Sequence, residues 1–186
     1  MPHVLGGGSP RSPRVPRHAP GRIRLVCLLL LTGLLIPATV PGAEVYFSPG
    51  GGIRPRLLRA IEAARRSIDI AVYNFTSKEL AEALYAAKGR GVQIRILVDQ
   101  ENSEEGFVIR GLRRHSLPVR TLGVQEQSLM HHKFAVFDDR LVATGSYNWT
   151  QSAEHANYEN LVVLDDPEVI GRFQREFNRL WQNAKE

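Results

Sequence analysis

Residues 67–99 read SIDIAVYNFTSKELAEALYAAKGRGVQIRILVD, and this stretch decides the class of fold. Its two ends, residues 67–73 and 92–99, are rich in β-branched and other apolar residues, which favours two strands. Between them, Thr76-x-x-Glu79 matches a capping box and predicts the start of a helix. The order strand, helix, strand indicates an α/β fold.

The same alternation continues through the rest of residues 44–186. The other strands are predicted at 44–47, 119–122, 129–137, 141–146 and 160–165. The helices are predicted at 55–66, 76–88, 107–115 and 167–181. We therefore expect a single α/β domain over residues 44–186, with a mixed β-sheet sandwiched between helix layers.

The charge of the chain is unevenly distributed. Its 186 residues include 24 Lys and Arg against 19 Asp and Glu, which gives a formal net charge of +5. Residues 1–43 contain no acidic residue, and their basic residues are Arg11, Arg14, Arg17, Arg22 and Arg24. Residues 44–186 are therefore formally neutral, so any affinity for a polyanion has to come from a local set of cations.

Composition excludes several classes of protein. A hydrophobic content of 43% is too high for a disordered chain. The single cysteine, Cys27, excludes a disulfide framework and a cysteine-based zinc site.

Residues 1–43 have the features of a leader. The apolar run at 25–36, LVCLLLLTGLLI, has the length of a signal-peptide hydrophobic region and follows a positively charged segment. Pro37 breaks the run, and small residues after it offer a cleavage point near Ala43. We expect export to the periplasm or secretion after this cleavage. The alternative is an uncleaved membrane anchor, because residues 25–40 could nearly span a thin bilayer.

Residues 130–160 read MHHKFAVFDDRLVATGSYNWTQSAEHANYEN and carry the candidate chemistry. Side chains alternate along a strand, so His131 and Lys133 point to one face and His132 to the other. Burial of an imidazole beside an ammonium in a core is energetically unfavourable, but such a pair is well suited to binding an anion. We therefore expect His131 and Lys133 to share a phosphate-like charge.

Further polar groups follow this pair. Gly145-Ser146-x-Asn148 adds a hydroxyl and an amide at the end of the next predicted strand. Glu159 adds a carboxylate, which can hold the Nδ1–H of an imidazole and so aim its Nε2 at an electrophile. Asp138 falls on the opposite face of its strand, so a role in a turn or an ion pair suits it better.

Two other interpretations of these residues remain. His131 and His132 could form a metal pair, but neighbouring strand residues face opposite ways and no further ligand lies at a suitable spacing. We therefore expect neither a metal nor another cofactor. The same groups could also form a phosphate-binding module without catalytic activity.

The spacing of these residues resembles the signature of the phospholipase D superfamily: His131-x-Lys133-x4-Asp138, then Gly145-Ser146-x-Asn148 and Glu159-Asn160. The resemblance covers nearly all of residues 44–186 and is to the small members that have one such motif. Those are bacterial secreted endonucleases and phospholipase D-like proteins of the mitochondrial surface. The mitochondrial type carries extra cysteines before its first core helix, and this chain has none there, which favours the bacterial type. The family fold, a mixed sheet between helix layers, agrees with the expected elements.

The resemblance implies phosphodiester hydrolysis by double displacement. The nucleophile would be His131, which forms a phosphohistidine while a second histidine protonates the leaving oxygen. Cationic and amide groups would bind the non-bridging oxygens, and the glutamate would orient the nucleophile. The implied catalytic residues are His131, Lys133, Asn148 and Glu159, the implied substrate-binding residues are Lys133, Ser146 and Asn148, and the structural ones are Asp138 and Gly145.

The chain contains one H-x-K motif, whereas the implied reaction needs two histidines. A symmetric homodimer with the active site on its two-fold axis would supply the second histidine, with each subunit giving the same catalytic residues.

The residues themselves leave the substrate open. The loop predicted at 100–106 is acidic and would repel a nucleic-acid backbone if it lined the site. No apolar run outside the leader indicates a surface for lipid. Resemblance to the secreted nucleases favours DNA or RNA as the substrate, and phospholipid headgroups are the alternative.

Overall fold

The computed structural model describes residue 3 and residues 42–101, 106–123 and 128–186. The chain divides into two units, 1–38 and 39–186, and every helix and strand named below belongs to the second unit. The predicted leader therefore lies almost entirely outside the described residues, as does the central part of the acidic loop 100–106. Among the described residues, each helix is too short or too polar to cross a bilayer.

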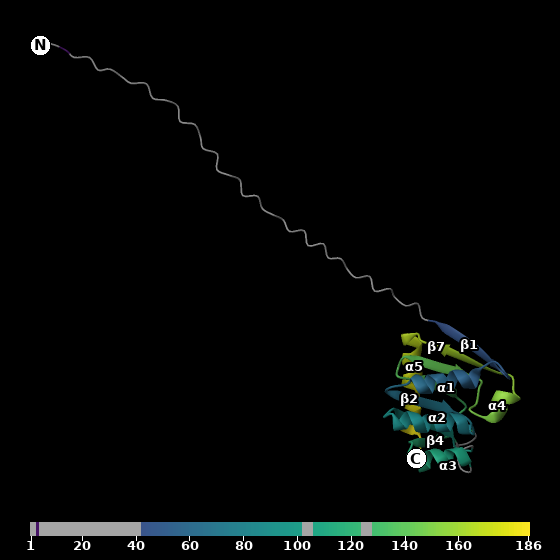
Figure 1. Ribbon diagram of the computed structural model, residues 1–186. Coiled ribbons are helices and arrows are strands. Elements are labelled where there is room, and N and C mark those ends of the chain that lie inside the picture. Colours follow the sequence, from purple (N-terminus) through teal and green to yellow (C-terminus); the bar gives the residue numbers. More distant parts are fainter. Residues whose placement is uncertain (1–2, 4–41, 102–105, 124–127) are drawn as a thin grey trace. The chain divides into compact units, whose positions relative to one another are not determined.

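Seven strands form one mixed sheet in the order β1-β7-β6-β5-β2-β3-β4 (Figure 1). They are β1 (Ala43–Ser48), β2 (Ser67–Val72), β3 (Gln93–Asp99), β4 (Val119–Leu122), β5 (Lys133–Phe137), β6 (Leu141–Gly145) and β7 (Glu159–Leu164). β2, β3 and β4 run parallel, and the other neighbouring pairs are antiparallel. One end of the sheet is therefore formed where β2, β3 and β6 finish and where β5 and β7 begin.

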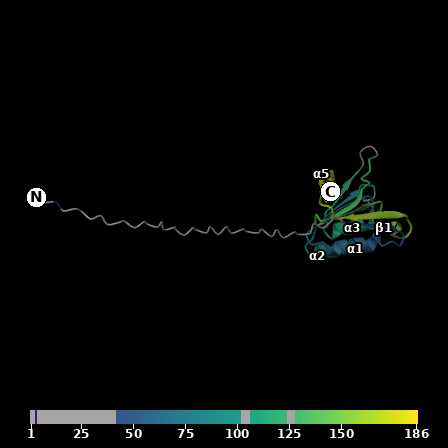
Figure 2. The same ribbon diagram turned by 90° about the horizontal axis from the view of Figure 1, so that it is seen from above.

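Helices cover both faces of this sheet. They are α1 (Ile53–Ala63), α2 (Lys78–Gly89), α3 (Phe107–Arg114), α4 (Gln151–His155) and α5 (Pro167–Asn183). α1, α2 and α3 pack on one face, and Figure 2 shows α5 on the side of the sheet opposite to α1 and α2. The expected mixed sheet between helix layers is therefore confirmed. The sequence did not predict α4, which replaces part of a polar loop and is capped by the Thr150 hydroxyl.

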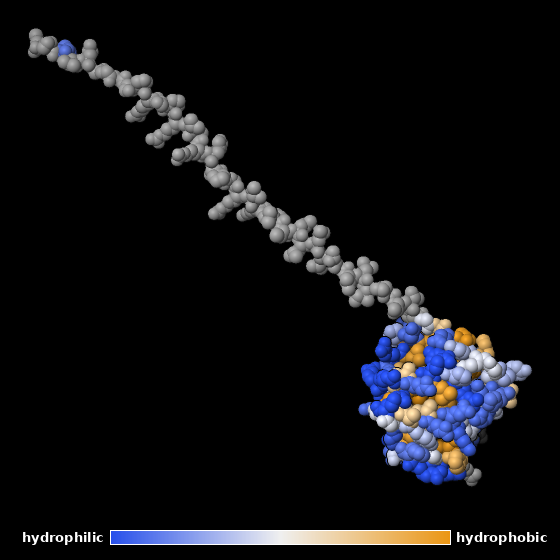
Figure 3. All heavy atoms as spheres, viewed as in Figure 1, coloured by the Kyte–Doolittle hydropathy of each residue, from blue (hydrophilic) through white to orange (hydrophobic). Residues whose placement is uncertain are grey.

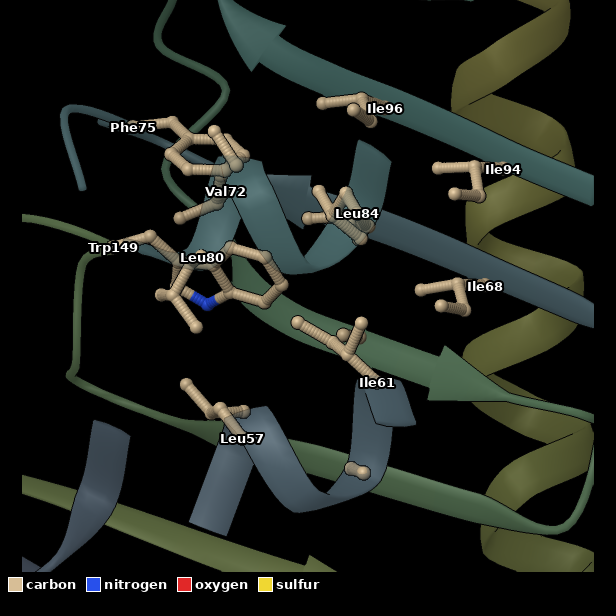
Figure 4. Packing of buried hydrophobic residues seen from close by; sticks show 14 of the residues in the cluster. Leu57, Ile61, Ile68, Val72, Phe75, Leu80, Leu84, Ile94, Ile96 and Trp149 are labelled. Atoms are coloured by element: carbon tan, nitrogen blue, oxygen red, sulfur yellow. The ribbon is translucent and has the colours of Figure 1, made fainter. Parts of the chain in front are cut away.

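Alternation of side chains along the strands divides the buried residues between two cores. Ile68 and Val72 of β2 face α1 and α2, whereas Ala71 faces α5. Figure 4 shows side chains of α1 and α2, among them Ile61 and Leu84, gathered over the strands. Full burial of one such side chain contributes roughly 1.5–3 kcal/mol to folding. On the face drawn in Figure 3, hydrophilic residues make up most of the surface, with smaller hydrophobic patches between them.

The first helix begins two residues earlier than the predicted range 55–66. Gly52 takes a left-handed φ of 85° and turns the chain into the helix at Ile53. Pro55 then occupies the third helical position, where the backbone needs no N–H because first-turn donors have no partner within the helix. The helix ends at Ala63, three residues before the predicted end.

The predicted capping box of α2 is not formed. The residue that caps the helix is Ser77, whose hydroxyl accepts a backbone N–H from three residues further on. The N–H groups of Thr76 and Ser77 both donate to Trp149 O, at 2.9 and 2.8 Å, so residue 76 is held outside the helix. Glu79 therefore lies one position too early for the box, and it pairs with Arg54 at 3.0 Å instead.

The turn between β5 and β6 is tied to the start of β2. Asp138 has a φ of 54°, and its carboxylate accepts the backbone N–H groups of Arg65, Arg66 and Ser67 at 2.9, 2.7 and 2.9 Å. Burial raises the pKa of Asp138, but the three donors outweigh this effect, so the pKa lies below its ordinary value. Asp138 therefore serves a turn at the end of the sheet far from His131.

We predict that Asp138→Asn lowers the free energy of unfolding at pH 7 by about 1–2 kcal/mol, because asparagine tolerates the positive φ but loses the charge. Since the folded pKa is lowered, the carboxylate stabilises the protein above about pH 4 and loses this effect as pH falls through the folded value. Urea unfolding at pH 7 and pH 3 should show a smaller difference between the two proteins at pH 3. Asp139→Asn, at an exposed neighbour, is the control and should change stability little. A difference that does not depend on pH would contradict the assignment.

Candidate active site

The residues predicted to be catalytic meet at one end of the sheet. They are His131 just before β5, Lys133 at the first position of β5, Asn148 after β6 and Glu159 at the first position of β7, with Ser146 directly after β6. Because β5, β6 and β7 are antiparallel neighbours, the start of β5, the end of β6 and the start of β7 lie at the same end of the sheet.

The two adjacent histidines lie outside β5, which begins four residues later than the predicted strand at 129–137. The ladder still extends by one bond, because Tyr73 N–H donates to His132 O at 2.8 Å. The His132 ring packs against Phe134 at 5.5 Å, and its Nε2 lies 3.5 Å from Glu176 Oε1 on α5. His132 therefore turns toward α5, on the side of Phe134 that the alternation predicted.

His131 and Lys133 both contact the ring of Tyr73. The ring centroids of His131 and Tyr73 are 4.6 Å apart, and the rings are tilted by 56°. Lys133 Nζ lies 4.9 Å from the Tyr73 ring centroid and donates to His131 O at 2.7 Å. Burial lowers the pKa of Lys133, and the carboxylates of Glu159 and Asp99 oppose that shift without cancelling it.

Glu159 is bound by residues of its own neighbourhood. Ser146 Oγ donates to Glu159 Oε2 at 2.5 Å, and Asn157 Nδ2 donates to Oε1 at 3.0 Å. Among the described residues, Glu159 therefore has no hydrogen bond to His131, which the sequence had assigned to it. The reason is register: β6 pairs with β7 at Gly145 and Leu161, so the next residue, Ser146, lies beside the start of β7.

Gly145 makes this close contact between β6 and β7 possible. A Cβ atom at this position would collide with the backbone carbonyl of Asn160. Ser146 N–H donates to the same carbonyl at 3.2 Å, and Asn160 N–H donates to Ser146 Oγ at 3.1 Å. The Ser146 hydroxyl is therefore engaged with β7 on both its donor and its acceptor side.

Asn148 is joined to the other half of the site through the segment after β2. Its Oδ1 accepts Asn74 N–H at 3.2 Å, which leaves the Nδ2 group as its donor. Trp149 N–H donates to Asn74 O at 3.1 Å, and the Trp149 ring meets Phe75 edge to face at 5.1 Å. The loop after β6 is thus held against the end of β2.

Three residues of this arrangement were missed from the sequence: Tyr73, Asn74 and Asp99. Asp99 is fully buried at the end of β3, and its Oδ2 accepts Met130 N–H at 2.8 Å, which fixes the segment leading to His131. The sequence did contain a signal for these three residues, because all of them stand at the carboxyl ends of adjacent parallel strands, where binding sites of α/β sheets are usually found.

A groove of about 750 Å³ opens beside His131 and His132. Its wall on the other side comes from the end of α5 and the residues after it, among them Arg179, Asn183 and Lys185. A second groove, of about 670 Å³, surrounds the ion pair of Asp69 and Arg95 near the opposite end of the sheet, away from the predicted catalytic residues.

The side chains at this end of the sheet can bind an anion and supply a nucleophile. An exposed imidazole, an ammonium, an amide donor and a carboxylate lie on adjoining segments. Such a set can bind a phosphate group and stabilise charge that develops on its oxygens. Within the part of the chain that the structure describes, no three His, Cys, Asp or Glu side chains come together in a way that could hold a metal ion.

Known proteins share both the sequence and the fold. A family model described as "Cardiolipin synthase, PLD-like domain" matches residues 57–181. The mitochondrial cardiolipin hydrolase of Homo sapiens is 38% identical over 152 residues, which cover 76% of this chain and 60% of that protein. The protein of the same name from Chlamydomonas reinhardtii is 37% identical over 133 residues, which cover 70% of this chain and 58% of that protein. This chain therefore spans about three-fifths of the length of these relatives.

Solved structures agree with these matches. Nuc from Salmonella typhimurium, a phospholipase D family member, has a TM-score of 0.72 and 32% sequence identity, over 78% of this chain and 97% of that one. NucT from Helicobacter pylori has a TM-score of 0.71 and 27% identity, over 78% of this chain and 98% of that one. The family match extends over α1 to α5 and includes every residue from His131 to Glu159. The chain therefore belongs to the phospholipase D superfamily.

Proposed function

We propose that this protein is a phosphodiesterase that cleaves DNA or RNA through a phosphohistidine intermediate. The observation that carries the proposal is the meeting of His131 and Lys133 on one aromatic ring, at the sheet edge that also holds Asn148 and Glu159. In a chain of this superfamily, that set matches the groups needed for double displacement at phosphorus.

The proposed reaction proceeds in two displacements. His131 Nε2 forms a bond to phosphorus while the bond to the leaving oxygen breaks, and a second histidine gives that oxygen a proton. Water, deprotonated by the same histidine, then attacks phosphorus and releases His131. Lys133 and the Nδ2 group of Asn148 stabilise the non-bridging oxygens in both steps. These groups carry the chemistry without a metal ion or another cofactor.

The hydrogen bonds of Glu159 refine its proposed role. Because Ser146 and Asn157 hold its two oxygens, Glu159 is a fixed carboxylate near Lys133 and opposes the lowering of the Lys133 pKa by burial. Ser146 acts through Glu159 in this arrangement and not on the substrate.

The groove beside His131 supports a nucleic-acid substrate. Its described lining residues include Arg179, which is paired with Glu176 of α5 at 2.8 Å, and Lys185, whose ammonium has no ion pair among the described residues. Lys185 therefore adds a local positive charge to a domain whose formal charge is zero. A strand of nucleic acid places a phosphate at each nucleotide, and such cations can contact phosphates next to the one being cleaved.

Phospholipid headgroup hydrolysis is the second candidate, and one observation favours it. Phe47 and Tyr158 lie beside Glu159 at the site end of the sheet and are 62% and 93% exposed. Exposed aromatic side chains of this kind can enter a lipid interface. The relatives from human and alga are also named as hydrolases of cardiolipin, a phospholipid.

We further propose that the protein acts as a homodimer with the site on the two-fold axis. One chain places a single histidine, His131, with Lys133, because His132 turns away toward α5. The second histidine of the reaction then comes from the partner subunit. The exposed side chains at the site end of the sheet, Phe47, Leu129 and Tyr158, supply apolar surface that such a contact would bury.

For localisation, we propose export with cleavage after Ala43, and membrane anchoring as the alternative. Cleavage there would remove one residue from β1 and leave Glu44–Ser48 paired with β7. The strand that closes this side of the sheet would therefore survive processing.

Activity gives the first test. The purified protein should hydrolyse bis(p-nitrophenyl) phosphate and single-stranded DNA or RNA in the presence of EDTA, and His131→Ala should lower kcat by about 1,000-fold or more. His115→Ala, at the far end of α3, is the matched control and should keep full activity. Equal rates for His131→Ala and the unmodified protein would exclude His131 as the nucleophile. Hydrolysis of cardiolipin vesicles without cleavage of nucleic acid would replace the first candidate by the second.

The dimer is tested by sedimentation and by subunit mixing. Sedimentation velocity should show a dimer that carries the activity. Equal amounts of unmodified and His131→Ala protein are mixed until the subunits have exchanged at random. The activity should then be about one quarter of that of unmodified protein at the same total concentration, because each site needs two intact histidines. A fall to one half, or an active monomer, would mean that each chain contains a complete site.

The leader is tested by the mass of the mature protein. Expression of the full chain in a bacterium with a carboxyl-terminal tag should yield an exported product that begins at Glu44. A full-length product recovered with the membranes would support the anchor instead.

A further inference from the structure

Tyr73 occupies a fixed place between the two groups that the proposed reaction uses first. It is the residue directly after β2, and its N–H donates to His132 O at 2.8 Å. This bond adds one rung beyond the pair of Val72 and Lys133, so the Tyr73 backbone stands opposite the residue that separates His131 from Lys133. Its ring can reach both of these side chains.

The ring makes one contact with each of them. Its centroid lies 4.6 Å from the centre of the His131 imidazole and 4.9 Å from Lys133 Nζ. A tilted pair of rings is a favourable packing geometry, and an ammonium over a ring face is attracted by the negative charge of that face. The two attractions act on the same ring, which therefore couples the position of the imidazole to that of the ammonium.

Other restraints on these two side chains are few. His131 is exposed, and among the described residues no side-chain hydrogen bond holds its imidazole, since Glu159 is bound by Ser146 and Asn157. Lys133 has a flexible four-carbon stem, and its Nζ is held by one backbone carbonyl. A half-buried tyrosine attached to β2, an interior strand of the sheet, is a stiffer body than either of them.

We propose that Tyr73 is a positioning residue, whose ring sets the distance and direction between the His131 nucleophile and the Lys133 ammonium. This inference rests on the proposed phosphodiesterase function. The ring is the part that acts, because the contacts with His131 and Lys133 are both made to its face or edge. Misplacement of reacting groups by about 1 Å can lower a rate by about 100-fold, so a ring that fixes two groups at once controls kcat more than binding.

Kinetics of ring-keeping and ring-removing variants test the role. Tyr73→Phe keeps the ring and should retain kcat within about two-fold, whereas Tyr73→Leu should lower kcat by about ten-fold or more with KM changed by less than about two-fold. Tyr85→Leu is the matched control, since Tyr85 stacks on His115 at 3.9 Å far from the site. That variant removes a similar contact between a tyrosine and a histidine and should leave kcat unchanged.

A second measurement does not depend on turnover. The ring of Tyr73 displaces the imidazole proton resonances of His131 by its ring current, and His131→Ala identifies those resonances. They should move in Tyr73→Leu and stay in place in Tyr73→Phe. Thermal unfolding of both variants shows that the measured protein is folded.

The outcomes separate the inference from the function on which it rests. An unmodified protein without phosphodiesterase activity would overturn the proposed function and the role of Tyr73 with it. An active protein whose Tyr73→Leu variant is folded and keeps full kcat would overturn the role of Tyr73 alone. Equal losses in Tyr73→Phe and Tyr73→Leu would show that the hydroxyl acts, which also contradicts a role for the ring.

Discussion

The site depends on the hydrogen bonds that the segment after β2 makes to both of its sides. On one side Tyr73 N–H binds His132 O, and on the other Asn74 and the two residues after Phe75 bind the segment that follows β6. β2 lies inside the sheet, between β5 and β3, so the segment after it is the common frame for both sides. The start of β5 and the loop after β6 therefore have a fixed separation, although no hydrogen bond joins His131 to Asn148 among the described residues. Burial of Phe75 against Trp149 keeps water from competing for these bonds.

Local electrostatics at the site follow from how its carboxylates are bound. Glu159 accepts hydrogen bonds from Ser146 and Asn157, and buried Asp99 accepts them from backbone N–H groups. Each carboxylate is thereby held in place. Both counteract the lowering of the Lys133 pKa by burial, and the Lys133 ammonium donates to the carbonyl of His131. A domain with no formal net charge can thus present cations to an anion at this end of the sheet, where Lys133 lies beside His131 and Lys185 lines the groove.

The elements could be predicted from local patterns, and the errors have tertiary causes. Stretches rich in β-branched and apolar residues located every strand within a few residues. Helical spacing of apolar residues and helix-end signals located the four longer helices as closely. The cap of α2 moved from Thr76 to Ser77 because a carbonyl of a distant loop captures the N–H of Thr76. The strand expected from 129 starts at Lys133, and Leu129 pairs with Gly123 instead. The partners, Trp149 for Thr76 and Gly123 for Leu129, lie outside the segments whose structure they change, so a local sequence pattern could not reveal them.

The sequence on its own determined the α/β class, the residues that carry the candidate chemistry, and the resemblance of the motif from His131 to Glu159 to one superfamily. Spacing and periodicity are properties of a single segment, so they survive without coordinates. Which side chains contact one another was decided by the strand register and by the loops that meet at this end of the sheet. Ser146 turned out to bind Glu159, and Tyr73 to join His131 with Lys133, because contacts across strands depend on which residues the folded sheet sets side by side.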